Sequence, residues 1–98
     1  MAFLNSKTNN ISTETVVYTP SANSIGTVIG LTICPTSGND TTVSLSIEGT
    51  YITKDIIVTA GSTLVPIGGE QKLVVLDSES IKVTASDNVD VVVSVLEQ

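Results

Sequence analysis

The sequence has no histidine, no arginine and no tryptophan, and it contains a single cysteine, Cys34. Without histidine, the Ser-His-Asp and Cys-His arrangements of nucleophilic catalysis are excluded, because they use imidazole as the general base. Zinc loses its most common ligands for the same reason. One cysteine cannot form an internal disulfide, and its apolar neighbours predict a small buried side chain. These absences predict that the protein is not an enzyme.

Positive charge is also scarce, since four lysines stand against ten acidic residues and give a formal net charge of −6. No basic stripe can neutralise phosphates, so nucleic acid is not an expected partner, and an anionic membrane surface is disfavoured. No segment approaches the roughly 20 apolar residues of a membrane span, and the first ten residues lack the apolar run of a signal peptide. We therefore expect a protein that is made and kept in a cytoplasm.

What the sequence does contain is valine, isoleucine, threonine and serine, which together make up 50 of the 98 residues. β-Branched residues favour extended structure, and helical periodicity appears nowhere. A chain of this length forms one domain. The pattern predicts an all-β, single-domain β-sandwich, jelly-roll or Ig-like, of about eight short antiparallel strands. Polar turn clusters place these strands at residues 14–19, 27–34, 42–48, 51–59, 63–67, 71–76, 80–86 and 89–96.

Two kinds of strand can be distinguished by their alternation. Residues 42–48 and 80–86 alternate apolar with polar side chains, as in a strand with one wet face. Residues 89–96 instead place Val92 and Leu96 on the face opposite the main valine row. A small sandwich buries only one face of each sheet, so this surplus indicates an oligomer or a docked subunit. Irregular register, or an N-terminal segment folded over that face, would also account for it.

Residues 1–13 form a polar N-terminal arm, separate from the sandwich domain at 14–98. The arm carries two anchors of the kind that become buried, Phe3 and Leu4. One interpretation is a strand donated to the open sheet edge of a neighbouring subunit. The other is a frayed terminus.

Few other side chains suggest chemistry. The acidic turns at 77–79 and 87–90 could offer oxygens to calcium, although acidic turn residues more often make local hydrogen bonds. Tyr18 and Tyr51 could stack on a sugar, although their strand positions favour partly buried packing. We expect no cofactor and no metal site.

Several segments resemble a family of small virion structural proteins of tailed bacteriophages, including those of cyanobacteria. The resemblance spans roughly residues 15–97, and most of it lies in Tyr-Ile-Thr-Lys-Asp at 51–55 and Gly-Gly-Glu-Gln-Lys-Leu at 68–73. It implies a non-enzymatic subunit of the virion, such as a capsid cement or decoration protein. The implied partners are the major capsid protein or another virion protein, and further copies of this chain. A trimer is favoured, because decoration proteins often occupy local threefold axes. A neck, tail, baseplate or fibre component and a host-receptor module that binds glycans are the alternatives.

The expected contact residues come from three parts of the chain. The arm contributes its two anchors, and the last strand contributes its surplus apolar residues. The charged pair near the centre of strand 51–59 indicates a sheet edge or an ion pair between subunits, worth only about 0–1 kcal/mol if exposed. Glycine turns at 60–62 and 68–70 shape the neighbouring hairpins. The predicted interface residues are Phe3, Leu4, Tyr51, Lys54, Asp55, Val92 and Leu96.

Overall fold

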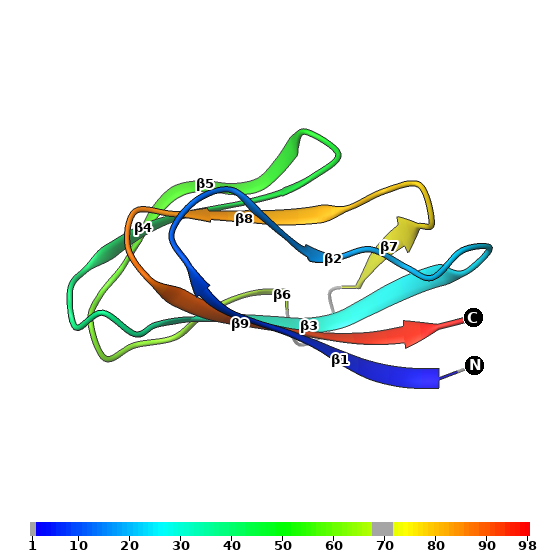
Figure 1. Ribbon diagram of the computed structural model, residues 1–98, viewed down its shortest axis with the longest axis horizontal. Coiled ribbons are helices and arrows are strands. Elements are labelled where there is room, and N and C mark those ends of the chain that lie inside the picture. The colour runs from blue at the N-terminus through cyan, green and yellow to red at the C-terminus, as the bar shows by residue number, and fades with distance from the viewer. Residues whose placement is uncertain (1, 68–71) are drawn as a thin grey trace.

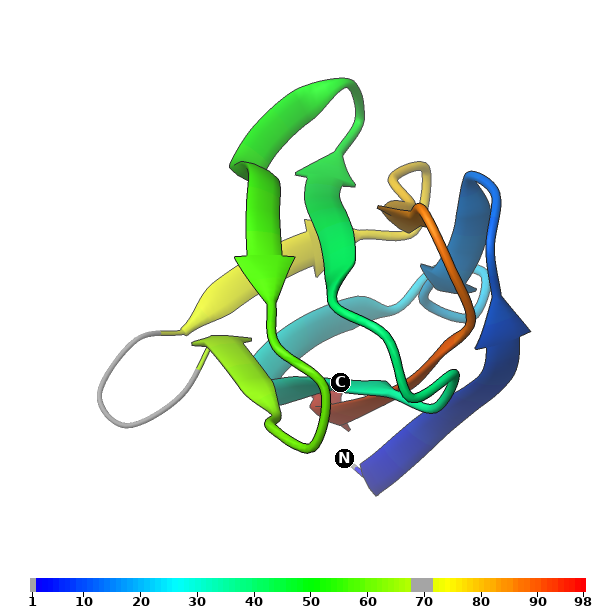
Figure 2. The same ribbon diagram turned by 90° about the vertical axis from the view of Figure 1, so that its left-hand side faces the viewer.

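The protein is a sandwich of two antiparallel β-sheets in the computed structural model, which describes residues 2–67 and 72–98 (Figure 1). Within those ranges the chain forms nine strands and no helix. The two sheets lie over one another with the core between them (Figure 2). The predicted all-β, single-domain sandwich is therefore confirmed. The strands are β1 (Ala2–Ile11), β2 (Thr15–Tyr18), β3 (Ile25–Pro35), β4 (Thr41–Ile47), β5 (Thr50–Val58), β6 (Leu64–Ile67), β7 (Leu73–Leu76), β8 (Ile81–Ala85) and β9 (Val89–Glu97).

The strand order identifies the sandwich as a jelly roll. Sheet A has the order β1-β9-β3-β6, and sheet B has the order β2-β8-β4-β5. The pairs are nested along the chain: β4 pairs with β5, β3 with β6, β2 with β8 and β1 with β9. This is the pattern of two Greek keys in two sheets. In an Ig-like sheet the first two strands are neighbours, whereas here β1 and β2 lie in different sheets. The remaining strand, β7, is not part of the jelly-roll order and extends sheet A by pairing with the first residues of β3.

The core consists of the inward side chains of both sheets, mainly valine and isoleucine. Side chains alternate between the two faces of a strand, so every second residue meets the opposite sheet. In β9 the inward row is Val89, Val91, Val93 and Val95, all at most 1% exposed, as the sequence predicts. The other large side chains that are fully buried are Ile11, Val28, Leu31, Ile33, Val43, Leu45, Ile67, Val75, Ile81 and Val83.

The eight predicted strands all exist, with ends that shift by a few residues. The turn expected at 60–62 is present, with Gly61 at a φ of 82° and the Ser62 N–H donating to the carbonyl of Thr59 over 3.1 Å. The turn expected at 68–70 lies outside the described residues. A turn at 60–62 is therefore confirmed, but the predicted hairpin is wrong, because this turn joins β5 of sheet B to β6 of sheet A and the two strands do not pair.

The N-terminal arm is where the structure departs most from the expectation. Residues 2–11 form β1, which pairs antiparallel with β9 of the same chain, from Ala2 opposite Glu97 to Ile11 opposite Val89. Ile11 is buried, and the Ser6 hydroxyl donates to the Val17 carbonyl of β2 over 2.7 Å, which joins the edges of the two sheets. In this single chain the arm is neither donated nor frayed. The backbone hydrogen bonds between β1 and β9 do not require an alternating side-chain pattern, so side-chain periodicity does not predict this pairing.

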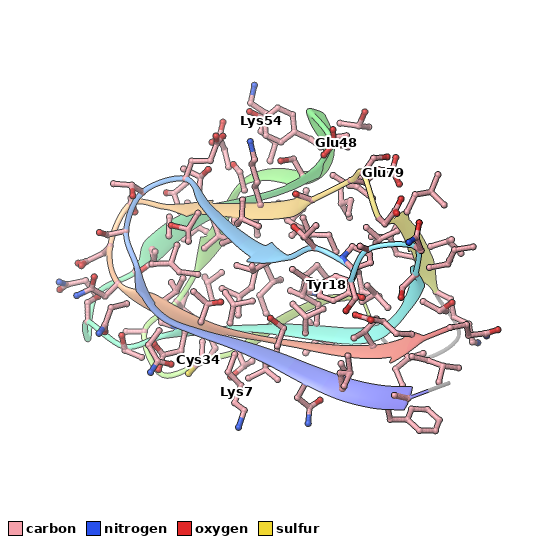
Figure 3. The ribbon with its side chains drawn as sticks, turned by 45° about the vertical axis from the view of Figure 1, so that its right-hand side comes forward. Lys7, Tyr18, Cys34, Glu48, Lys54 and Glu79 are labelled. Atoms are coloured by element: carbon pink, nitrogen blue, oxygen red, sulfur yellow. The ribbon has the colours of Figure 1, made fainter. Side chains whose placement is uncertain are left out.

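One end of the sandwich is closed by Tyr18. Its side chain is 6% exposed and lies between the sheets (Figure 3). The hydroxyl donates to Glu97 Oε2 of sheet A over 2.8 Å. Burial, together with the hydrogen bond and the negative charge of Glu97, raises the pKa of Tyr18 well above its ordinary value. Beneath the ring lies Gly26, where a β-carbon would approach Tyr18 Cε2 to 2.9 Å.

Candidate interaction surface

The outer face of sheet B is polar. Its central strands β8 and β4 present threonine and serine hydroxyls, and Lys82 forms an ion pair with Glu14 at 3.8 Å. Exposed apolar side chains occur only on the flanking edge strands of this face, as Val16 on β2 and Ile57 on β5, among the described residues. This face is what the sequence predicts for a sheet in contact with water. The hydroxyl residues are Thr42, Ser44, Ser46 and Thr84.

The outer face of sheet A is apolar, although no part of the described chain covers it. Its large exposed side chains come from all five strands of the sheet, with exposed fractions from 37% to 74%. Monomeric proteins scatter such residues, and a contiguous group of them marks an interaction surface. We call this group the apolar face. It comprises Phe3, Ile25, Ile29, Val65, Val74, Leu76 and Val92.

The strand register makes the apolar face continuous. Phe3 lies opposite Leu96, Leu96 opposite Thr27, and Thr27 opposite Val74, so one row crosses β1, β9, β3 and β7. Ile25 and Leu76 pair beside that row. Charged residues at outward strand positions in the described part of sheet A are confined to Lys7 of β1 and Asp90 of β9. Neither lies in the row that starts at Phe3.

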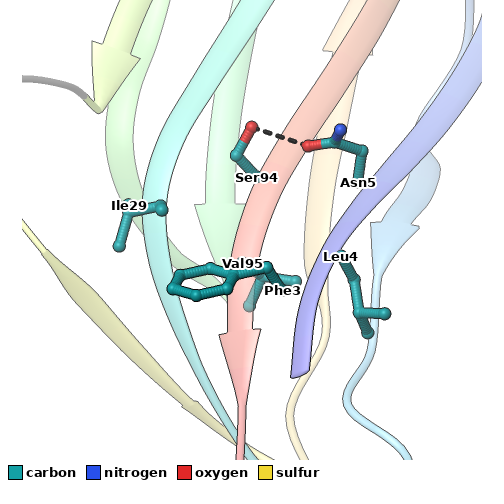
Figure 4. Close-up of a pocket in the computed structure, with 6 residues that line it drawn as sticks. All are labelled: Phe3, Leu4, Asn5, Ile29, Ser94 and Val95. Carbon is teal, nitrogen blue, oxygen red and sulfur yellow. Dashed lines mark hydrogen bonds between the residues drawn. The ribbon is translucent and has the colours of Figure 1, made fainter. Parts of the chain in front are cut away.

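A hollow of about 250 Å³ opens in the apolar face beside Phe3. Figure 4 shows the Phe3 side chain lying over β9 with its ring toward Ile29 of β3, and the Ser94 hydroxyl donating to Asn5 Oδ1 over 2.9 Å. The register of β3 shifts at Ile29, and Gly30 lies opposite Ser94. Small residues therefore occupy the row next to Phe3, which leaves the hollow open. Its lining is Phe3, Leu4, Asn5, Ile29, Ser94 and Val95.

The predicted interface residues fall into two separate groups. Phe3 and Val92 belong to the apolar face, and the half-buried Leu96 lies between Phe3 and Thr27 in the row that crosses it. Leu4 lies on the same strand as Phe3, opposite the inward Val95, and contributes to the lining of the hollow. Tyr51, Lys54 and Asp55 lie on β5, at the edge of the other sheet. The structure thus does not bring the seven residues together in one surface.

The β5 group forms a local structure of its own. Lys54 Nζ lies 5.0 Å from the centre of the Tyr51 ring, a cation–π contact. Asp55 has a φ of 52° at a register shift between β4 and β5, and its N–H donates to the Ser44 hydroxyl over 2.9 Å. The edge location predicted for the charged pair is confirmed. Tyr51, expected to be partly buried, is 54% exposed, because its position on β5 is outward and no strand follows at that edge.

Two further corrections concern sheet A. Cys34 was expected to be buried but is exposed, because its neighbour Ile33 takes the inward position of β3. The sequence interpretation also missed Ile25, Ile29 and Val65 as surface residues. In β3, the alternation of inward and outward positions from Gly26 to Ile33 could have assigned its isoleucines to a face. The register shift at Ile29 interrupts that alternation and obscures the assignment.

The acidic turns serve as hydrogen-bond acceptors, both within the turns and for loops that are distant in the sequence. Asp77 accepts from the Asn23 N–H over 2.8 Å, and Glu79 accepts from the Leu76 N–H over 3.0 Å. Asp87 accepts from the Asn88 N–H over 2.8 Å, and this bond, with help from Asn39 and Ser37, lowers the pKa of the carboxyl. Within residues 2–67 and 72–98, no group of three potential ligands stands together as a calcium or other metal site would require.

Comparison of the chain with protein-family models, curated proteins and solved structures finds no match. The resemblance to phage virion proteins therefore stays a prediction from sequence motifs. The described residues contain no helix with the length and apolar character needed to cross a membrane. The strongest functional feature of the described structure is the contrast between its two outer faces.

Proposed function

We propose that this protein is a structural subunit of a tailed-phage virion, acting as a capsid cement or decoration protein that binds through its apolar face. The observation that carries the proposal is the asymmetry of the sandwich, with hydroxyls outside sheet B and seven large apolar side chains outside sheet A. The sequence resemblance supplies the virion as the setting. Jelly rolls form viral capsid domains and also lectins, so the fold is compatible with this role without selecting it.

The mechanism would be non-covalent burial of apolar surface across the boundaries between capsid proteins. The exposed fractions of the seven side chains add up to about three and a half fully exposed residues, worth on the order of 5–10 kcal/mol if completely buried. Loss of translational and rotational freedom on binding offsets part of this gain. A rigid, internally hydrogen-bonded sheet limits the further cost of ordering the surface.

The test is to locate the protein on intact particles by gold-labelled antibody and electron microscopy. Label over the whole head supports a cement or decoration role, and label confined to the neck or tail contradicts it in favour of a neck, tail, baseplate or fibre component. Absence from purified particles contradicts the virion assignment altogether. Particles assembled without the protein should lose their DNA at a lower temperature and regain stability when the purified protein is added.

A matched pair of variants tests the surface itself. Val74→Asp places a charge in the apolar face, whereas Val16→Asp places the same charge outside sheet B. Both valines lie on four-residue edge strands and are about equally exposed, at 56% and 48%. Val74→Asp should abolish rescue of the particles, and Val16→Asp should preserve it. Equal rescue by both variants would contradict docking through the apolar face.

Sugar binding is the second candidate, and the exposed Tyr51 is the observation that favours it. An aromatic face on an edge strand can stack on a sugar ring. Lys54 lies over the Tyr51 ring, however, and occupies one side of it. Binding of the free protein to cells or immobilised glycans, lost in Tyr51→Ala, would establish the receptor-binding role. A cement subunit should bind only particles.

A further inference from the structure

The apolar face poses the question of what covers it, and its size gives a first constraint. The seven exposed side chains leave on the order of 600 Å² of apolar surface in water, at roughly 150–200 Å² for each fully exposed large side chain. A stable protein interface buries about 800 Å² on each partner. The exposed area of these apolar side chains, together with that of the neighbouring hydroxyl residues Thr27, Thr32 and Ser94, is therefore close to the area that one partner buries in a stable interface.

The distribution of charge gives a second constraint. The chain carries a net charge of −6, so two copies repel one another in most orientations. The apolar face is the exception, because the outward positions of described sheet A strands carry one acid, Asp90, and one lysine, Lys7. Copies of this chain can therefore bring these faces together with few like charges at the described strand positions between them. A surface that meets itself in this way is the usual basis of symmetric oligomers.

The shape of the apolar face, with an exposed ring beside a hollow, gives a third constraint. Phe3 is the most exposed large apolar side chain of the described residues, at 74%, and the hollow of about 250 Å³ lies directly beside it. A protruding ring and a recess on the same face can match a copy of themselves reciprocally. We propose that the apolar face is covered by the same face of further copies of this chain, with Phe3 of each copy seated in the hollow of another. This inference rests on the proposed function, which already assigns binding to the apolar face.

Gly30 supports this arrangement because its backbone does not require glycine. Its φ lies outside the left-handed region, and a β-carbon there would have no neighbour closer than 3.9 Å. One of those neighbours is the β-carbon of Ser94, which lines the hollow. Glycine in a strand normally lowers stability relative to residues with a side chain. The missing side chain at this position leaves room on the outer face, where the seated Phe3 of another copy would need it.

The first experiment measures the mass of the full-length chain by analytical ultracentrifugation, between about 1 and 500 µM, a range that covers micromolar to near-millimolar dissociation constants. Wild type should exceed the 10.1 kDa of one chain as concentration rises. A dimer supports the inference, because a face that meets itself reciprocally closes with twofold symmetry. A trimer, the state that the sequence resemblance favours, would overturn the reciprocal seating of Phe3. Val74→Asp and Phe3→Asp should remain monomeric, whereas Val16→Asp should associate like wild type. A wild-type monomer over the whole range overturns the inference.

Gly30→Val separates association from folding. The added side chain should fill the space beside the hollow and weaken association at least about tenfold, a change of one decade in the dissociation constant. Its midpoint of urea unfolding, measured where the protein is monomeric, should equal or exceed that of wild type. Unchanged association with a folded Gly30→Val protein would overturn the seating of Phe3.

A thiol at position 27 offers a direct probe, because Thr27 lies between Leu96 and Val74 in the row that crosses the apolar face, and the sole cysteine, Cys34, can be replaced by serine. In thiol-free buffer, alkylation of the Cys34→Ser, Thr27→Cys protein by a maleimide should slow at least about tenfold as concentration rises, since the reagent then reaches only dissociated copies. The control is Cys34→Ser combined with Thr84→Cys, whose thiol lies outside sheet B. Its alkylation should not depend on protein concentration. Equal concentration dependence at both positions contradicts the choice of face.

The two proposals fail in different ways. A protein that stays monomeric but coats heads through Val74 leaves the proposed function intact and overturns self-association. A protein that associates through the apolar face but is absent from particles overturns the proposed function and leaves self-association intact.

Discussion

Replacing Gly26 with alanine should destabilise the protein strongly, although alanine usually improves a strand. The added β-carbon would approach Tyr18 Cε2 to 2.9 Å and Cζ to 3.0 Å, and the hydroxyl is nearer still. The ring has little freedom to move, because it is 6% exposed and its hydroxyl is bonded to Glu97 across the sandwich. Overpacking of this kind costs about 1–3 kcal/mol.

Displacement of the ring would also break the Tyr18–Glu97 hydrogen bond, and a bond to a charged group contributes about 1.5–3 kcal/mol. A gain of about 0.5–1 kcal/mol from replacing glycine in a strand partly offsets these losses. The net expectation is a loss of about 2–4 kcal/mol, which corresponds to a decrease in Tm of roughly 10–25 °C for a domain of this size.

The matched control is Gly30→Ala in the same strand, where the nearest atoms to the new β-carbon are 3.9 Å away. It should be neutral or stabilising by up to about 1 kcal/mol. Urea unfolding followed by far-ultraviolet circular dichroism gives both free energies. In a Tyr18→Phe background, which lacks the nearest atom, Gly26→Ala should cost at least about 1 kcal/mol less, since contacting residues are not additive. If the two alanine variants differ by less than about 0.5 kcal/mol, the packing argument is wrong.

Three other predictions concern Tyr18, Asp87 and Ile11. Because burial and Glu97 raise the pKa of Tyr18 in the folded state, its contribution is complete below about pH 10, the unfolded value, and is lost as pH rises further. Tyr18→Phe should flatten the decline of the unfolding free energy above that pH. The pKa of Asp87 is lowered by the Asn88 N–H, so its contribution is present above about pH 4 and disappears as pH falls through the folded value. Asp87→Asn should reduce the acid dependence of the unfolding free energy below about pH 4, the unfolded value, and an unchanged slope would contradict this assignment. Ile11→Ala should cost about 2–5 kcal/mol in urea unfolding, as expected for a buried residue; a cost below about 0.5 kcal/mol would mean that β1 lies outside the cooperative fold.

The sequence predicted the core well because burial in a sandwich follows a period of two. Val91 and Val93 alternate with Val92, and that alternation alone assigns the first two inward and the third outward. The same argument identified a surplus of apolar residues on one sheet. It could not identify the whole apolar face, because Ile25 and Ile29 of β3 and Val65 of β6 come next to the other members only through the strand order. A register shift at Ile29 also interrupts the period that would have placed it.

The wrong predictions for Cys34 and for the N-terminal arm have related physical causes, because both concern what side-chain alternation does and does not determine. Cys34 has apolar neighbours in the sequence, yet a strand position is inward or outward regardless of how apolar its neighbours are. β1 has almost no alternation, and its place is determined by the free backbone groups of β9 and by the single anchor Ile11. Side-chain patterns therefore predict which face a residue occupies, whereas edge pairing depends on hydrogen-bonding groups that every residue shares.

The same distinction explains why the seven predicted interface residues divide between two surfaces. The charged pair in strand 51–59 predicts a sheet edge, and the structure places Tyr51, Lys54 and Asp55 on the edge strand β5. Val92 and Leu96 are predicted from the surplus apolar face of the last strand and Phe3 as an anchor of the arm, and the three lie on the outer face of sheet A. An apolar residue that a strand cannot turn inward must be covered from outside or remain in water. The apolar face is thus the surface of this fold that a single chain leaves exposed to water. The β5 group, in contrast, already has partners within the chain, because Lys54 contacts the Tyr51 ring and Asp55 is hydrogen-bonded to Ser44.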